Sequence, residues 1–229
     1  MCPAYDYTPY KGCGRASKSS RIIGGDEVSP HSIPWQVGLL RGKSALSITC
    51  GGTLLTDKHV LTAAHCVFDD FGLIEASDIL VVVAEHDQSD SFDGVQHEIR
   101  SYTNHPQYFQ DAAFDYDFSM LHLTLPVELG DLAVPACLPD LRFLDDKLVG
   151  KYLTVSGWGR TDHPDYDYPD LLQTVDVPVI SQEDCIEAYG SSRITNSMIC
   201  AGYATGGMDS CQRDSGGRVM IFLKYVRQS

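Results

Sequence analysis

Residues 35–40, with the sequence Trp-Gln-Val-Gly-Leu-Leu, form a short apolar run between Pro34 and Gly42. Comparable runs recur at residues 60–61, 79–84, 120–125, 153–155 and 175–180, and Gly and Pro residues fall between them. Many short strands separated by turn residues are typical of an all-β barrel or sandwich. Helical signal is sparse: the capping box Ser181-Gln-Glu-Asp184 predicts one short helix that reaches Tyr189.

The composition of the chain excludes several classes of protein. It has 229 residues, of which 43% are apolar and 21% charged, and this suits one large or two modest globular domains. The net charge of −14 disfavours binding to nucleic acids and anionic membranes, and no apolar stretch approaches the ~18 residues of a membrane span. We therefore expect neither as a partner. An acidic adhesion module would fit the charge, but no other feature favours it.

The N-terminus and the cysteines point to an exported protein. Residues 1–21 lack Val, Leu and Ile, so they predict an exposed arm before a folded domain at residues 22–229. The eight cysteines form no C-x-x-C motif, and no H-x-x-x-H accompanies them, which favours disulfides in an oxidising compartment over a zinc site. Because Met1-Cys2-Pro3 begins no signal peptide, we expect the natural N-terminus to lie upstream and the protein to be extracellular.

Three residue types needed for nucleophilic catalysis stand in suggestive contexts. Ser215 lies in Asp214-Ser-Gly-Gly, where the glycines let a substrate approach, but its hydroxyl needs a base. His65, surrounded by small residues in Leu61-Thr-Ala-Ala-His-Cys, is the best candidate for that base. Asp117 leads directly into an apolar run, and a buried carboxylate there needs a partner such as His65; Asp115 is the alternative acid. Taken one at a time, each residue also has an ordinary structural explanation.

Together with other motifs, these residues resemble the chymotrypsin/trypsin family of serine endopeptidases. Eight motifs occur in the family's order between residue 13 and about residue 217. They are Arg21-Ile-Ile-Gly-Gly25, Pro34-Trp-Gln-Val37, Cys50-Gly-Gly-Thr-Leu54, Leu61-Thr-Ala-Ala-His-Cys66, Asp117-Phe-Ser-Met-Leu121, Gly157-Trp-Gly159, Met198-Ile-Cys-Ala-Gly202 and Asp209-Ser-Cys-Gln-Arg-Asp-Ser-Gly-Gly217. The resemblance implies two six-stranded antiparallel β-barrels.

The resemblance also implies a mechanism, which the family exemplifies. Ser215 would attack the scissile carbonyl, His65 would act first as base and then as acid, and Asp117 would fix the tautomer of His65. The backbone N–H groups of Ser215 and Arg213 would form the oxyanion hole. No cofactor and no catalytic metal are expected.

Specificity and activation follow from the same resemblance. Asp209, six residues before Ser215, would lie at the base of the primary pocket and pair with Arg or Lys of a substrate. Members of the family are made as zymogens that are cleaved before an Ile-x-Gly-Gly start. Here the cut would follow Arg21, which implies an activating protease that prefers basic residues. The freed amine of Ile22 would then pair with Asp214, a buried ion pair that serves as a switch.

The resemblance assigns three disulfides: Cys50–Cys66 beside His65, Cys185–Cys200 around the short helix, and Cys13–Cys137, which would keep the arm attached after cleavage. Cys2 and Cys211 would then have partners outside this sequence. The loop at residues 85–93 corresponds to one that binds calcium in some members, but an acid expected near Val95 is missing.

Two departures from the family support an alternative function. Arg213 stands where the family has Gly, and its side chain would strain the oxyanion loop and hinder bulky protein inhibitors. The chain also stops 14 residues after Ser215, whereas the family continues. We therefore expect the second barrel to lack its final strands and C-terminal helix. The alternative to a secreted trypsin-like endopeptidase is a non-catalytic homologue that acts as a binding or decoy protein.

Overall fold

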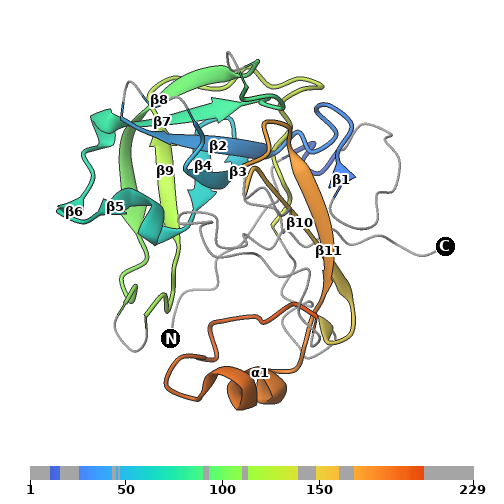
Figure 1. The fold of residues 1–229 in the computed structure, drawn as a ribbon. Coiled ribbons are helices and arrows are strands. Elements are labelled where there is room, and N and C mark those ends of the chain that lie inside the picture. Colours follow the sequence, from blue (N-terminus) through green and yellow to red (C-terminus); the bar gives the residue numbers. More distant parts are fainter. Residues whose placement is uncertain are drawn as a thin grey trace.

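The computed structural model describes residues 11–15, 26–42, 45, 47–89, 93–109, 113–138, 148–159 and 168–203, and strands dominate it (Figure 1). Each of the six apolar runs singled out in the sequence overlaps a strand, so the all-β prediction is confirmed. Within this part of the chain, no helix is long and apolar enough to cross a membrane.

Six antiparallel strands close into a barrel in the order β2-β3-β4-β9-β8-β7. Closure gives every strand two neighbours, so the barrel has no open edge. The strands are β2 (Gln36–Arg41), β3 (Cys50–Thr56), β4 (His59–Thr62), β7 (Ile79–Val83), β8 (Val95–Asn104) and β9 (Ser119–Leu123).

The barrel interior is filled by the apolar side chains of alternating strand positions. In β9, Ser119, Leu121 and Leu123 are buried, while Met120 and His122 between them are half-buried, which is the period-two pattern of a strand. Val37 of β2 and Val81 of β7 belong to the same core cluster as Leu121, and all three are fully buried. This single contiguous core makes the barrel the most extensively packed part of the described chain.

Short elements link the barrel strands on one side of the molecule. A 3₁₀ turn, η1 (Ala64–Val67), follows β4 and leads into a small hairpin of β5 (Phe68–Asp69) and β6 (Gly72–Leu73). A second 3₁₀ turn, η2 (Ala76–Asp78), precedes β7. The segment between β4 and β7 is therefore attached to the barrel at both of its ends.

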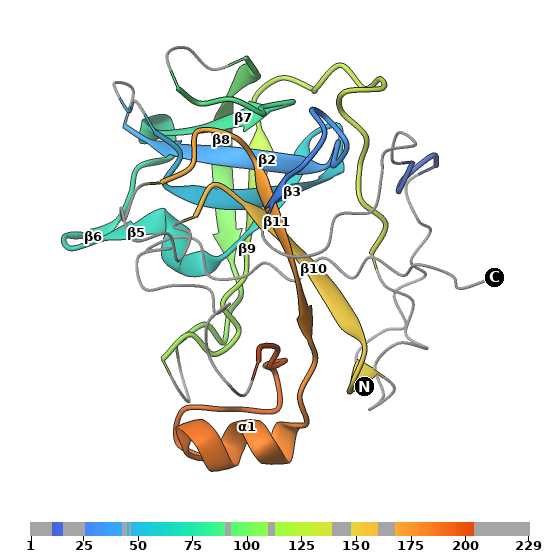
Figure 2. The same cartoon turned by 45° about the vertical axis from the view of Figure 1, so that its right-hand side comes forward.

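The remaining strands form a three-stranded antiparallel sheet in the order β1-β11-β10. The strands are β1 (Asp26–Glu27), β10 (Tyr152–Gly157) and β11 (Gln173–Pro178). In Figure 2, β10 and β11 run from beside the barrel towards α1. Two clusters of three buried residues pack here: Val28, Trp158 and Leu172 in one, and Leu153, Val177 and Val179 in the other.

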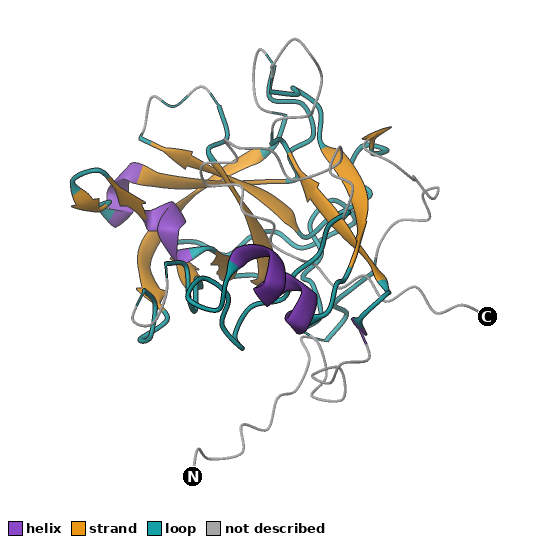
Figure 3. Cartoon of the chain, turned by 60° about the horizontal axis from the view of Figure 1, so that its bottom comes forward, coloured by secondary structure: helices purple, strands orange, loops and turns teal. Residues whose placement is uncertain are grey.

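The helix predicted from the capping box is confirmed as α1 (Gln182–Tyr189), which is labelled in Figure 1 and is the longest of the purple coils in Figure 3. The hydroxyl of Ser181 accepts a hydrogen bond from the backbone N–H of Asp184 at 3.0 Å, which satisfies one of the free N–H groups of the first turn. Gly190 ends the helix with a φ of 91°, a left-handed value that favours glycine.

The structure contains the three disulfides that the resemblance implies. Cys13–Cys137 joins the arm to the domain, Cys50–Cys66 joins β3 to η1, and Cys185–Cys200 joins α1 to the segment after it. The backbone N–H of Gly14 also donates to the carbonyl of Pro135 at 2.8 Å, so residues 11–15 are attached to the domain by more than one bond. Cys2 and Cys211 lie outside the described residues.

Candidate active site

His65 lies on η1, immediately after strand β4. The residues beside it, Ala64 and Cys66, are buried, and Cys66 is bonded to Cys50 on the neighbouring strand β3. Small buried residues let the turn lie close to the barrel, and the disulfide fixes the turn to the barrel wall. The backbone that carries the imidazole is therefore held on both sides of His65.

Arg41, at the end of β2, supports the same turn from another direction. Its Nε donates to the carbonyl of Cys66 at 3.1 Å, and its Nη2 donates to the carbonyl of His65 at 3.3 Å. Burial lowers the pKa of Arg41 from its usual value, and the nearby carboxylate of Asp69 opposes this shift. The planar guanidinium can reach two adjacent carbonyls at once, which an ammonium cannot do in the same geometry.

Asp117 reaches His65 because strands β4 and β9 are paired. Thr62 of β4 lies opposite Ser119 of β9. Asp117 precedes Ser119 by two residues and His65 follows Thr62 by three, so both leave the barrel at the same end. The pairing register thus places two residues together that are 52 positions apart in the sequence.

The carboxylate of Asp117 holds His65 by two hydrogen bonds. Its Oδ2 lies 2.7 Å from Nδ1 of the imidazole, and its Oδ1 accepts the backbone N–H of His65 at 2.9 Å. Both side chains are only 15% exposed, so water competes weakly for these bonds. A carboxylate at Nδ1 favours the tautomer with its hydrogen there, which leaves the lone pair on Nε2 and allows that atom to accept a proton.

The alternative acid, Asp115, is directed to other partners. It is 1% exposed, and its Oδ1 accepts hydrogen bonds from the hydroxyls of Thr195 and Ser197 and from the backbone N–H of Tyr116. The two hydroxyls, opposed by partial desolvation, hold the pKa of Asp115 below its usual value. Of the two acids that the sequence left open, the structure brings Asp117 to His65.

The imidazole of His65 has an aromatic neighbour on the same loop as Asp117. Phe114 meets the ring edge-on, with centroids 5.8 Å apart and an interplanar angle of 86°. Nε2 of His65 lies 3.7 Å from Sγ of Cys66, which is a weak partner. Together with Asp117, these contacts define the orientation of the ring.

This cluster is a poor candidate for a metal centre. Within the described ranges, one group of three ligand-type side chains has all its ligand atoms within 4.8 Å of one another: Cys50, His65 and Cys66. Cys50 and Cys66 form a disulfide, so neither offers the thiolate that zinc or another soft metal binds. Only the imidazole remains as an ordinary ligand.

The loop that corresponds to a calcium-binding loop uses carboxylates to close itself. Asp93 accepts the backbone N–H of His86 at 2.7 Å, and Glu85 accepts that of Gly94 at 3.1 Å. Burial, with a hydrogen bond to Asp93, raises the pKa of Glu85 to about 7. Burial tends to raise the pKa of Asp93 as well, but hydrogen bonds from His86, Glu85 and Asp87 bring it below its usual value.

The carbonyl of His86 connects this loop to the three-stranded sheet. It accepts both Nε1–H of Trp158 at 3.1 Å and the backbone N–H of Leu172 at 2.9 Å. Nε2 of the His86 side chain also lies 3.3 Å from Oε1 of Glu27 on β1. His86, with the described residues beside it at 85–89, therefore forms the junction between the barrel and the sheet.

The other predicted site residues lie outside the described part of the chain. They are Arg21, Ile22, Asp209, Arg213, Asp214 and Ser215. Arg41, Phe114 and the partners of Asp115 were not predicted from the sequence. Arg41 carried no motif, and its hydrogen-bond partners are 24 and 25 residues away, so only the barrel closure reveals its position.

The sequence of this chain is similar to those of known serine proteases. The Trypsin family model matches residues 22–221. Clotting factor G beta subunit of Tachypleus tridentatus is 34% identical over 217 residues, which cover 92% of this chain and 69% of that protein. Serine protease 1 of Rattus norvegicus is 38% identical over 202 residues, which cover 87% of this chain and 74% of that protein.

A third relative is much longer than this chain. The suppressor of tumorigenicity 14 protein homolog of Bos taurus is 38% identical over 212 residues, which cover 90% of this chain but 24% of that protein. The family match over most of the chain, together with relatives above 30% identity, shows that this chain belongs to the trypsin family of serine proteases.

Proposed function

We propose that this protein is a serine endopeptidase that hydrolyses peptide bonds after Arg or Lys with Ser215, His65 and Asp117. The observation that carries the proposal is the two-bond contact between Asp117 and His65, at 2.7 and 2.9 Å. It prepares the imidazole to accept a proton at Nε2, which is the property a serine nucleophile needs from its base. Membership in the trypsin family supports the same chemistry.

In the proposed reaction, each proton has a defined path. Nε2 of His65 takes the proton of the Ser215 hydroxyl as Oγ bonds to the substrate carbonyl carbon, and then gives it to the leaving amine. Water releases the acyl group by the same steps. Asp117 stays ionised and stabilises the imidazolium, while the N–H groups of Ser215 and Arg213 hold the oxyanion.

Activation and specificity are part of the proposal. We infer that the protein is an extracellular zymogen, that a protease which prefers basic residues cuts after Arg21, and that the amine of Ile22 then pairs with Asp214. Asp209 would bind the Arg or Lys side chain of the substrate. The bond between Cys13 and Cys137 supports this scheme, because the arm at residues 1–21 would stay covalently attached after the cut.

One observation favours a second candidate, a non-catalytic homologue that binds proteins. Arg213 stands where family members have glycine. A loop that needs a left-handed residue there would strain an arginine, and a rotated peptide would remove one oxyanion donor, which is worth about 10²–10³ in rate. The two candidates differ in turnover, and therefore in a direct assay.

The test is hydrolysis of chromogenic peptides ending in Arg or Leu, with the protein cleaved after Arg21. We expect turnover of the Arg peptide only, a loss of about 10³-fold or more in kcat for Ser215→Ala or His65→Ala, and a loss of Arg preference for Asp209→Ser. A matched Arg21→Gln zymogen should stay inactive. If the cleaved protein neither turns over the peptide nor reacts with a serine-directed fluorophosphonate, the non-catalytic candidate is correct.

A further inference from the structure

Asp115 is a buried carboxylate two residues before Asp117, and it spans a long distance in the sequence. Its Oδ1 accepts a hydrogen bond from Oγ1 of Thr195 at 2.7 Å and another from Oγ of Ser197, 80 and 82 residues away. The backbone N–H of Tyr116 donates to the same oxygen at 3.1 Å. Burying a carboxylate is costly without such partners, so these donors fix where Asp115 can lie.

The loop around Asp115 has an unfavourable backbone. Phe114 and Tyr116, on either side of it, have φ values of 67° and 48°, which aromatic residues rarely adopt. Such conformations persist when the surrounding structure holds them in place. Here the carbonyl of Asp115 accepts the N–H of Phe109 at 3.1 Å, and the ring of Tyr116 stacks on His105 with centroids 4.6 Å apart.

Two residues of this loop contact His65. Phe114 packs its ring against the imidazole, and Asp117 holds the imidazole by two hydrogen bonds. Asp115 stands between these two residues. If the loop relaxed to an ordinary backbone conformation, Phe114 and Asp117 would both shift relative to the ring.

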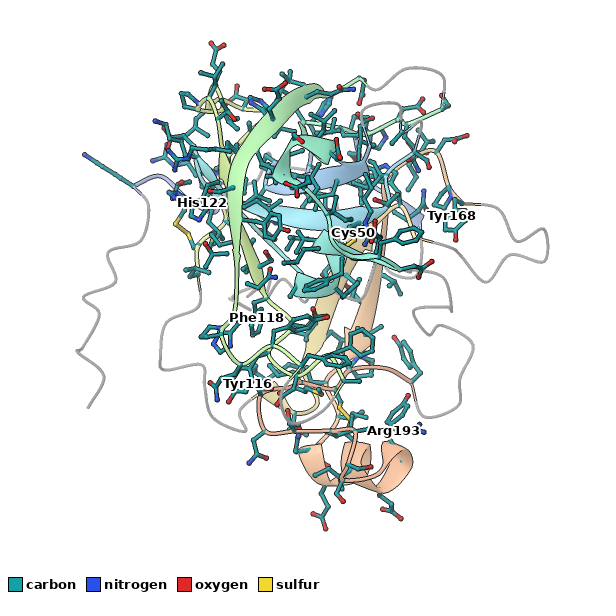
Figure 4. All side chains as sticks on the ribbon, turned by 90° about the vertical axis from the view of Figure 1, so that its left-hand side faces the viewer. Cys50, Tyr116, Phe118, His122, Tyr168 and Arg193 are labelled. Atoms are coloured by element: carbon teal, nitrogen blue, oxygen red, sulfur yellow. A yellow bond between two sulfur atoms is a disulfide. The ribbon has the colours of Figure 1, made fainter. Side chains whose placement is uncertain are left out.

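The donors of Asp115 belong to a segment that is itself well held. Nε2 of Gln182, in the first turn of α1, donates to the carbonyl of Thr195 at 2.7 Å. The disulfide Cys185–Cys200 joins α1 to the chain just beyond Ser197. Figure 4 places Tyr116 and Phe118 on the side of the barrel that faces α1 and Arg193, so the loop and the helix lie at one end of the molecule.

We propose that Asp115 is a positioning residue: its hydrogen bonds to Thr195 and Ser197 clamp the loop of residues 113–117 and thereby hold Asp117 against His65. We call these three residues the Asp115 clamp. It couples the segment after α1 to the orientation of an imidazole on the barrel. The activity readout rests on the proposed function, whereas the spectroscopic readout below does not.

The test uses the full chain with Asp115→Ala, Asp115→Asn and the double variant Thr195→Val/Ser197→Ala. In ¹⁵N-histidine NMR spectra, the hydrogen-bonded Nδ1 proton of His65, assigned with His65→Gln, should broaden or disappear in Asp115→Ala and in the double variant. Asp115→Asn keeps an acceptor at Oδ1 and should largely retain it. After cleavage at Arg21, we expect the kcat of Asp115→Ala and of the double variant to fall by about 10- to 100-fold, with little change in KM.

A matched control separates positioning from general stabilisation. Asp176 on β11 also accepts a hydroxyl hydrogen bond, from Thr154 at 2.6 Å, and has no described contact with His65 or Asp117. Asp176→Ala should leave the His65 resonance and kcat unchanged. If the double variant keeps the wild-type resonance, the clamp is refuted, even should Asp115→Ala fail to fold. If neither the wild type nor any variant cleaves the peptide, but the His65 Nδ1 resonance is lost in Asp115→Ala and in the double variant, then the clamp is supported and the proposed function is refuted.

Discussion

The closed barrel and the three-stranded sheet are stabilised in different ways. Each barrel strand has two hydrogen-bonded neighbours around one contiguous core. In the sheet, β1 and β10 are each paired on one side within the described residues, and the buried clusters contain three residues each. The sheet therefore depends more on contacts with other segments, such as the hydrogen bonds from Ser156 to Gln36 of the barrel and from Tyr203 to the carbonyl of Asp176.

This difference explains where the candidate catalytic pair is built. His65 lies just after strand β4 and Asp117 just before strand β9, and the register of these two barrel strands is fixed by the core. The contribution from the other region comes through side chains, namely those of Thr195 and Ser197 on Asp115. The barrel positions the backbone of the pair, and the segment after α1 adjusts the loop that carries the acid.

Two of the three disulfides give the sharpest comparison of the regions and the largest expected effect. Cys50–Cys66 and Cys185–Cys200 span 16 and 15 residues, so chain entropy gives each about 3 kcal/mol of stability. We expect both double alanine variants to lose a similar free energy of unfolding in urea. Cys50→Ala/Cys66→Ala should lower kcat more, by about tenfold or more, because Cys66 adjoins His65, whereas Cys185→Ala/Cys200→Ala acts on the site only through Thr195 and Ser197. Equal losses of activity would contradict a site held mainly by the barrel.

Arg41 tests how the end of the barrel supports η1. Arg41→Met removes two hydrogen bonds to the carbonyls of His65 and Cys66, and it should cost about 1–2 kcal/mol in the free energy of unfolding. Arg41→Lys should recover less than half of this, because an ammonium does not match the two carbonyls as the planar fork does.

The control for Arg41 is an exposed arginine in the other region. Arg193→Met, beyond α1, should change the free energy of unfolding by no more than about 0.5 kcal/mol. Comparable losses at both positions would mean that the hydrogen bonds of Arg41 add nothing to the barrel.

Glu85 tests the junction between the two regions, with the smallest effect. Burial raises its pKa to about 7 from 4.5, so between these pH values the folded protein holds a proton that the unfolded chain releases. Its contribution to stability is complete below pH 4.5 and is lost as pH rises through 7, with a slope of at most about 1.4 kcal/mol per pH unit. The lowered pKa of Asp93 acts in a more acidic range.

Thermal unfolding from pH 5 to 7.5 measures this effect. Glu85→Gln should flatten the decline of Tm with rising pH, whereas Glu98→Gln, at an exposed position of β8, should leave it unchanged. If wild type and Glu85→Gln show the same dependence of Tm on pH, the carboxyl of Glu85 does not exchange its proton with folding in this range.

Local apolar patterning predicted much of the barrel. The runs at residues 35–40 and 79–84 became β2 and β7 because buried strands need continuous apolar side chains. Strand β8 was not predicted, because its sequence Val-Gln-His-Glu-Ile-Arg-Ser-Tyr-Thr-Asn is mostly polar and Ile99 is its one buried residue. Its pairing register with β9 also shifts between Ile99 and Ser101. Such a strand exists because its neighbours supply the ladder.

The candidate site was predictable where motifs carried it. Asp117 could be chosen over Asp115 by its closeness to the apolar run, but the reason for burying Asp115 lay in Thr195 and Ser197, which no local pattern connects to it. Arg41 was equally hidden, because its role depends on strand β2 ending beside η1. Long-range hydrogen bonds of single side chains leave no periodic trace in a sequence.

The hydrogen bond of Trp158 at the junction has a practical consequence. The protein has two tryptophans, and they report on different regions: Trp35 packs against the barrel core, whereas Trp158 is buried at the junction, where it donates to the carbonyl of His86 and packs with Val28 and Leu172. Replacing either one with Phe leaves a single tryptophan, whose emission can be excited apart from that of the tyrosines. The emission of each variant then follows the opening of one region alone, so the order in which barrel and junction come apart is accessible without any added label.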